Sequence, residues 1–224
     1  MTEPGGLDGE VVTRAFGLMA DELARHGLRG EVLLAGGAVM ALEYDATRVT
    51  RDVDGLVLDG HGAVLRAADI AAGELGLRRG WLNEGVSVYL SSVDDPGRHA
   101  IFDRPALSVL AVSTEHLVAL KARAARPQDL ADLAILADRL AMSTSDEVLA
   151  IVERFFPEDP ISERAQAAVE DAFRQIVDRG SQRGAWGERA ASLIVGSEPY
   201  DSGLAAHHDD DTAISNDVEF GAGD

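Results

Sequence analysis

The sequence predicts an α/β fold, a mixed sheet with packed helices, followed by a helical C-terminal domain. Short apolar runs alternate with amphipathic stretches through the first half of the chain, which is typical of a sheet covered by helices. After Ser113 only helical periodicity remains. The chain has 224 residues, 46% of them hydrophobic, which suffices for one large domain or two small ones. We predict an α/β domain over 1–113, a helical domain over 114–196 and a disordered acidic tail over 197–224.

The elements of the first half follow from periodicity and from turn residues. Apolar residues at helical spacing predict a helix from Leu7 to His26, which Gly27 ends. The other expected elements of this half are strands at 31–34, 53–58, 86–90 and 107–112, extended chain near 99–102, and helices at 38–44 and 61–75.

Capping residues define the helices of the second half. Ser113 or Thr114 is expected to cap the first of them, and Pro127 suits the first turn of the next. Beyond Gly196 apolar residues are sparse and the charge has one sign, which is typical of disorder. The expected helices run over 114–125, 127–140, from a cap at 143–147 to about 155, over 162–179, and over a short stretch at 188–193.

The composition excludes several classes of protein. The absence of cysteine excludes disulfides, thiolate metal sites and cysteine nucleophiles. A formal net charge of −19 argues against broad nucleic-acid binding. No apolar run approaches the ~18 residues of a membrane span, and the first residues lack a basic region followed by an apolar one. We therefore expect a cytoplasmic protein with no membrane association.

The stretch from Leu33 to Leu58 carries the clearest functional signal. Gly36 and Gly37 separate a strand from a helix, and glycines at such a turn let backbone N–H groups approach phosphate oxygens. Asp52 and Asp54 begin the next strand, where residues two apart share a face. Neighbouring carboxylates repel each other unless a cation such as Mg²⁺ or Mn²⁺ neutralises them. These features together predict the transfer of a nucleotidyl or phosphoryl group.

Both features also have simpler structural explanations. The glycine turn can serve only close packing of a strand against a helix, and the two aspartates can form a solvated strand end. Leu56 and Leu58 continue on the same face as the aspartates, so that face is expected to be partly buried. Unpaired carboxylates are costly in such a place, and this favours the metal-binding hypothesis.

Basic residues accompany the aspartates. Arg48 and Arg51 flank Thr50 just upstream, and either arginine can clamp a phosphate or remain a surface charge. Lys121 is the only lysine of the chain. Its compact ammonium is suited to act as a point charge on phosphate, although a single lysine can also persist by chance.

Asp129 and Asp132 follow Lys121 on a later helix. They lie three residues apart and share a helix face. An ion pair with Arg126 or Arg123 is the simpler interpretation, and a direct catalytic role is the alternative.

The motifs in this order resemble the nucleotidyltransferase fold, in particular the branch of AbiEii-type bacterial toxins and their uncharacterised bacterial relatives. The resemblance covers roughly residues 10–160. Three segments carry it: Gly36-Gly37 followed by Arg48-x-Thr50-Arg51-Asp52-x-Asp54; Trp81-Leu82-Asn83-Glu84, similar to a Trp-Leu-Asn-acid motif; and 115–133, similar to a Lys-containing helix followed by an Arg and two spaced Asp.

The resemblance implies Mg²⁺-dependent transfer of a nucleoside monophosphate from an NTP to a hydroxyl of a protein, a tRNA or a small molecule. It implies a toxin–antitoxin or phage-defence context, with an antitoxin as partner, and it places Lys121 near the active site. The expected site residues are Asp52, Asp54, Lys121 and Glu84 for catalysis, Asp52 and Asp54 for the metal, and Gly36, Gly37, Arg48, Thr50, Arg51, Asn83 and Arg126 for the nucleotide.

The sequence departs from the family pattern at one point. Nucleotidyltransferases usually carry a third carboxylate on a neighbouring strand, and the expected strand 86–90 has none. Glu84 is the preferred substitute because it lies in the family-like motif, and Asp103 is the other candidate. The departure supports an alternative hypothesis, a non-catalytic nucleotide-binding or regulatory protein with a degenerate site.

Overall fold

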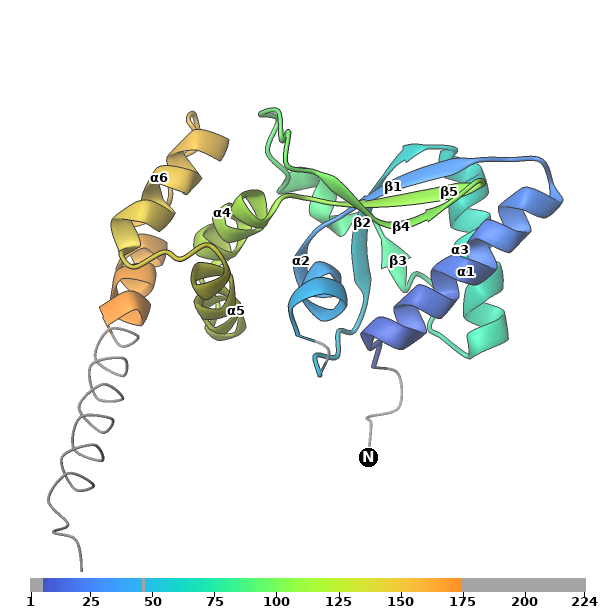
Figure 1. The fold of residues 1–224 in the computed structure, drawn as a ribbon, viewed down its shortest axis with the longest axis horizontal. Coiled ribbons are helices and arrows are strands. Elements are labelled where there is room, and N and C mark those ends of the chain that lie inside the picture. Colours follow the sequence, from blue (N-terminus) through green and yellow to red (C-terminus); the bar gives the residue numbers. More distant parts are fainter. Residues whose placement is uncertain (1–5, 46, 175–224) are drawn as a thin grey trace, which may run out of the picture. The chain divides into compact units, whose positions relative to one another are not determined.

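A computed structural model describes residues 6–45 and 47–174. The expected acidic tail and the helix at 188–193 lie outside these residues, as does the end of the helix expected at 162–179. The described chain is an α/β structure built on a mixed five-stranded sheet in the order β3-β2-β1-β5-β4 (Figure 1). Its strands are β1 (Gly30–Leu34), β2 (Val53–Asp59), β3 (Leu82–Asn83), β4 (His99–Arg104) and β5 (Leu107–Ala111).

The central strand β1 has two different neighbours. It pairs in parallel with β5, with Val32 opposite Val109, and antiparallel with β2, with Leu33 opposite Leu56. Beyond these, β4 lies antiparallel to β5, and β3 pairs in parallel with β2 over two residues. Val32 and Leu34 are fully buried, as expected for a strand at the centre of a covered sheet.

Two long helices cover one face of the sheet. Helices α1 (Gly9–Arg25) and α3 (His61–Leu75) lie side by side against it (Figure 1), and both follow the predicted ranges. Asp8 caps α1 by accepting a 2.8 Å hydrogen bond from the Val11 N–H. Trp81 is buried in this layer, and its indole N–H donates to the Ala68 carbonyl at 2.9 Å.

A short helix connects β1 to β2. It begins as α2 (Gly36–Val39) and continues as one turn of π-helix (Met40–Tyr44). It packs against β2 and against α4, and Tyr44 Oη lies 2.8 Å from Thr114 Oγ1 at the start of α4. The connection predicted at 38–44 is therefore helical, and it links the sheet to the second half of the chain.

The described part of the second half, residues 114–174, has helices and no strands, as predicted for these residues. It contains α4 (Thr114–Ala124), α5 (Pro127–Arg139), α6 (Ser145–Phe155) and a helix over 163–174. Ser113 caps α4, accepting from the His116 N–H at 3.1 Å, and Thr144 with Glu147 forms a capping box on α6. Helix α4 packs against both α5 and α6 (Figure 1).

One predicted element is wrong. The sequence predicts a strand over Val86–Leu90, but Gly85–Val88 forms a 3₁₀ turn, η2. The ladder between β2 and β3 ends after Asn83 because the Glu84 side chain, not the following backbone, accepts the Val57 N–H. The chain therefore leaves the sheet, and its alternating apolar residues include exposed ones. In the described residues no helix has the length and apolar character required to cross a membrane.

Candidate functional site

A cleft of about 1120 Å³ gathers residues from distant parts of the sequence. Its walls include Gly36 at the start of α2, Asp54 on β2, Gly85 on η2, Lys121 on α4 and Arg126 just before α5. Four of these five were expected at the site, and Gly85 was not. Small-molecule pockets typically enclose about 300–1,000 Å³, so the cleft has room for a nucleoside triphosphate.

Asp54 is the acidic centre of this cleft. It is the second residue of β2 and is partly buried. Burial, together with the nearby Asp52 carboxylate, raises the pKa of Asp54 above its ordinary value, although the neighbouring Asn83 side chain acts to lower it. Lys121 and Arg126 lie near enough to oppose this rise. Asp54 is therefore a carboxylate whose charge the described residues neutralise only in part.

Gly36 leaves the approach to Asp54 open. Its φ of +72° lies in the left-handed region, which residues with a Cβ atom rarely adopt. A Cβ at this position would stand 3.7 Å from Asp54 Oδ2. The glycine turn therefore brings backbone, and no side chain, next to the carboxylate.

Asp52 lies immediately before β2, not within it. The Thr50 hydroxyl donates to its carbonyl at 3.0 Å, and Arg78 Nη2 lies 3.6 Å from its carboxylate. Thr50 also adjoins the glycine turn, because a Cβ at Gly37 would meet Thr50 Oγ1 at 3.0 Å. Thr50 therefore holds the Asp52 backbone against the turn, whereas the neighbouring Arg51 is exposed.

Five charged residues form an ion-pair cluster on the helical side: Arg48, Lys121, Arg126, Asp129 and Asp132. The Lys121 ammonium lies 3.0 Å from Asp129 Oδ1 and 2.7 Å from Asp132 Oδ2, the latter as an ion pair rather than an aligned hydrogen bond. Arg126 Nε donates to Asp129 Oδ2 at 2.6 Å, and Arg48 donates to Asp132. The expected pair between Arg126 and Asp129 is thus present.

This cluster is buried at its centre and reaches the cleft at its edge. Asp129 and Asp132 are fully buried and Lys121 is 5% exposed. Burial works to raise the pKa of Asp129, but hydrogen bonds from Arg126 and Lys121 outweigh it and hold that pKa below its ordinary value. Three cations face two anions here, so the cluster carries a net positive charge towards Asp54. Arg48 joins the cluster but does not line the cleft.

The structure turns Glu84 towards other partners. Its carboxylate accepts from the Val57 N–H at 3.1 Å and lies 2.7 Å from His61 Nε2. The His61 contact, with the Val57 hydrogen bond, lowers the pKa of Glu84. Asp103 lies on β4, at the opposite edge of the sheet. Within 6–45 and 47–174, no group of three or more Asp, Glu, His or Cys side chains is arranged to hold a metal.

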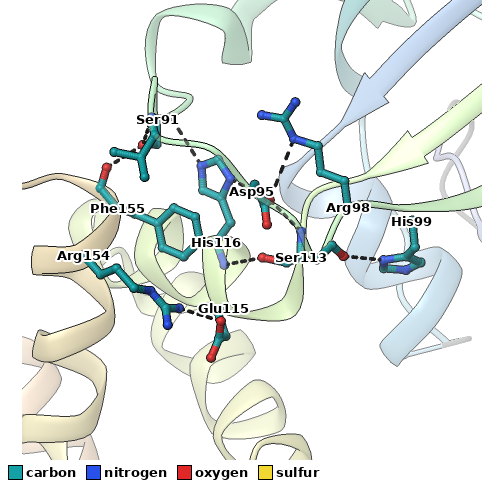
Figure 2. Close-up of polar contacts among 11 residues, drawn as sticks. Ser91, Asp95, Arg98, His99, Ser113, Glu115, His116, Arg154 and Phe155 are labelled. Atoms are coloured by element: carbon teal, nitrogen blue, oxygen red, sulfur yellow. Dashed lines mark hydrogen bonds and ion pairs between the residues drawn. The ribbon is translucent and has the colours of Figure 1, made fainter.

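A second polar network lies where the loop after η2 meets the helices. Figure 2 shows His116 between Asp95 and Ser91. The Ser91 N–H donates to His116 Nε2 at 3.2 Å, so Nδ1 carries the proton that it shares with Asp95 at 3.0 Å. Burial lowers the pKa of His116, and its ring stacks on Phe155 at 4.6 Å. Sequence patterns did not indicate this network, because its partners lie on separate segments without a recognisable spacing.

Comparison of the chain with protein-family models, with curated protein sequences and with solved structures found no match.

Proposed function

We propose that the protein is a nucleotidyltransferase that moves a nucleoside monophosphate from an NTP to a hydroxyl acceptor with Mg²⁺ or Mn²⁺. The observation that carries the proposal is the convergence on one cleft of the glycine turn, Asp54 and the positive edge of the ion-pair cluster. The order of motifs typical of the nucleotidyltransferase fold supports the same conclusion.

Two carboxylates would hold a hard divalent cation, Asp54 on the cleft wall and Asp52, which lies just before β2 and does not line the cleft. Asp52 and Asp54 offer carboxylate oxygens, which Mg²⁺ and Mn²⁺ prefer, and the raised pKa of Asp54 reflects charge that a cation would compensate. A bound cation would neutralise charge on the triphosphate. The two aspartates would hold the cation, and the glycine turn and the cluster would contact the phosphates.

The phosphates would lie between the glycine turn and the cationic edge of the cluster. Arg126 is well exposed on the cleft wall. Lys121 contacts Asp129 and Asp132 and also lines the cleft, where its ammonium would act as a point charge on a phosphate. In the transfer, a bond from the acceptor oxygen to the α-phosphorus would form as the bond from that phosphorus to the departing pyrophosphate breaks in line, and the hydroxyl proton would pass to water.

The central experiment is calorimetric titration with Mg²⁺ and each NTP. Asp52→Asn and Asp54→Asn should each abolish Mg²⁺-dependent NTP binding. Asp59→Asn, an exposed aspartate at the far end of the same strand, is the matched control and should bind as the parent does. If all three variants bind Mg²⁺–NTP like the parent, the proposed site is wrong.

A non-catalytic nucleotide-binding or regulatory protein is the second candidate. The engagement of Glu84 by Val57 and His61 favours it, because this carboxylate was the expected third acid. Incubation with each α-labelled NTP, Mg²⁺ and cell extract separates the two candidates. Label transferred to protein, RNA or a small molecule supports the enzyme, whereas binding without transfer supports the second candidate. The toxin–antitoxin or phage-defence context and an antitoxin partner remain proposals that depend on the resemblance.

A further inference from the structure

Two apolar side chains stand in solvent on the wall of the cleft. Val88 at the end of η2 is 80% exposed and the following Tyr89 is 68% exposed. These are the highest values among the large hydrophobic residues of the described chain. Such side chains cost solubility and add nothing to the core, so their position beside a cleft indicates a ligand.

This end of the cleft has further apolar residues beside polar ones that include Ser91, Ser92 and Glu158. Leu120 and Ala124 line it from α4, and Phe156 and Pro157 line it from the end of α6. The Arg123 guanidinium lies over the Phe156 ring at 4.2 Å from the centroid. The cleft therefore has a charged region at Asp54, and its aromatic residues Tyr89 and Phe156 stand among apolar side chains and the Arg123–Asp159 ion pair.

The 3₁₀ turn connects these two parts of the cleft wall. Gly85 adjoins Asp54, since a Cβ there would stand 3.6 Å from Asp54 Oδ1. Tyr89 follows four residues later, and a 3₁₀ helix rises about 2.0 Å per residue. The rise along the turn thus separates the backbone of Tyr89 from that of Gly85 by about 8 Å, and both residues line the cleft.

The segment that presents Tyr89 is anchored on its C-terminal side. Ser91 donates its hydroxyl to the Phe155 carbonyl and its N–H to His116, as Figure 2 shows. Asp95 in turn holds His116 and accepts from the Ser113 N–H at 3.0 Å. Tyr89 therefore lies two residues from a buried attachment of the backbone.

We propose that Val88 and Tyr89 form a nucleobase-stacking subsite, with Tyr89 as the platform for the base. The inference rests on the proposed function, since it assumes that the triphosphate lies near Asp54. Stacking on an aromatic ring accepts every base, because each base has a π-face. The subsite therefore adds affinity for nucleotides over inorganic polyphosphates without selecting one base by stacking alone.

The test compares two probes on matched variants. The probes are Mg²⁺ with each of the four NTPs and Mg²⁺ with inorganic tripolyphosphate, both measured by calorimetry. Tyr89→Ala should weaken binding of every NTP by about tenfold or more, and Tyr89→Phe should stay within about twofold of the parent because the ring is kept. Neither should change tripolyphosphate binding. Ile70→Ala, an exposed apolar residue on α3 that does not line the cleft, is the control.

The outcomes separate this inference from the proposed function. The subsite is wrong if Tyr89→Ala leaves NTP binding unchanged, if it weakens tripolyphosphate equally, or if the parent binds NTP no more tightly than tripolyphosphate. If Tyr89→Ala weakens NTP binding while Asp54→Asn does not, the stacking subsite is supported and the proposed metal site is wrong. If the parent binds neither probe, both proposals are overturned.

Discussion

The cleft joins two charged regions that differ in how far their carboxylates are neutralised by nearby cations. In the ion-pair cluster, Asp129 and Asp132 are fully buried and each contacts cations. At the glycine turn, Asp54 is partly buried beside Asp52, a second carboxylate. The pKa of Asp129 lies below its ordinary value, whereas that of Asp54 lies above it.

This difference assigns different tasks to the two regions. Because Asp129 and Asp132 each contact cations, their charges are compensated, and the cluster mainly holds α4, α5 and the Arg48 segment together. A carboxylate that remains incompletely neutralised destabilises the free protein and gains most from a ligand cation. The cluster therefore belongs chiefly to stability and Asp54 to binding, and variants can separate these roles.

The largest effect is expected from Lys121→Met, which keeps most of the side-chain volume and removes the charge. It leaves Asp129 and Asp132 buried with less compensation, and breaking a buried pair typically costs about 3–5 kcal/mol. Urea denaturation should therefore show a free energy of unfolding lower by that amount.

The control for Lys121 is an exposed ion pair. Arg154 lies 2.5 Å from Glu115, and both side chains are about half exposed (52% and 45%). Arg154→Met should cost no more than about 1 kcal/mol. If Lys121→Met proved as mild as this control, the cluster would not be a stabilising element and Lys121 would be free for a purely ligand-directed role.

Asp54→Asn is expected to change the free energy of unfolding in the direction opposite to Lys121→Met. The pKa of Asp54 is raised in the folded protein, so folding favours its protonated form. The Asp54 carboxyl therefore stabilises the folded protein at a pH below its ordinary pKa of 3.8. This stabilisation is lost as the pH rises through the raised pKa of the folded protein. At neutral pH the ionised group therefore destabilises the metal-free protein.

Asp54→Asn should match the parent or exceed it at pH 7, by up to about 1 kcal/mol. The gain should vanish below about pH 4, where the parent carboxyl is protonated. Thermal unfolding of both proteins over this pH range, in the presence of a chelator, measures it. A variant clearly less stable than the parent at neutral pH would show that Asp54 is a structural residue like Asp129.

The sequence anticipated the order of elements better than the roles of charged residues. Periodicity and caps predicted α1, α3 and α4 because these signals are local. The strand expected at Val86–Leu90 was wrong because the Glu84 side chain ends the ladder, and a tertiary contact of this kind leaves no periodic signal. In the same way, the pairing of Lys121 with Asp132 depends on how α4 and α5 pack, which the sequence motifs around these residues do not show.

The smallest effect on stability is expected from Glu84→Gln. This variant also tests whether Glu84 takes part in the transfer reaction. The glutamine carbonyl can still accept the Val57 N–H. The contact that is lost is with His61, whose side chain is 60% exposed. The free energy of unfolding should change by about 0.5 kcal/mol or less. If Glu84 only ends the β2–β3 ladder, NTP binding and label transfer should remain at the parental level. A large loss of transfer with intact stability and binding would instead identify Glu84 as the third acid, which requires that its carboxylate leave His61 when substrate enters the cleft.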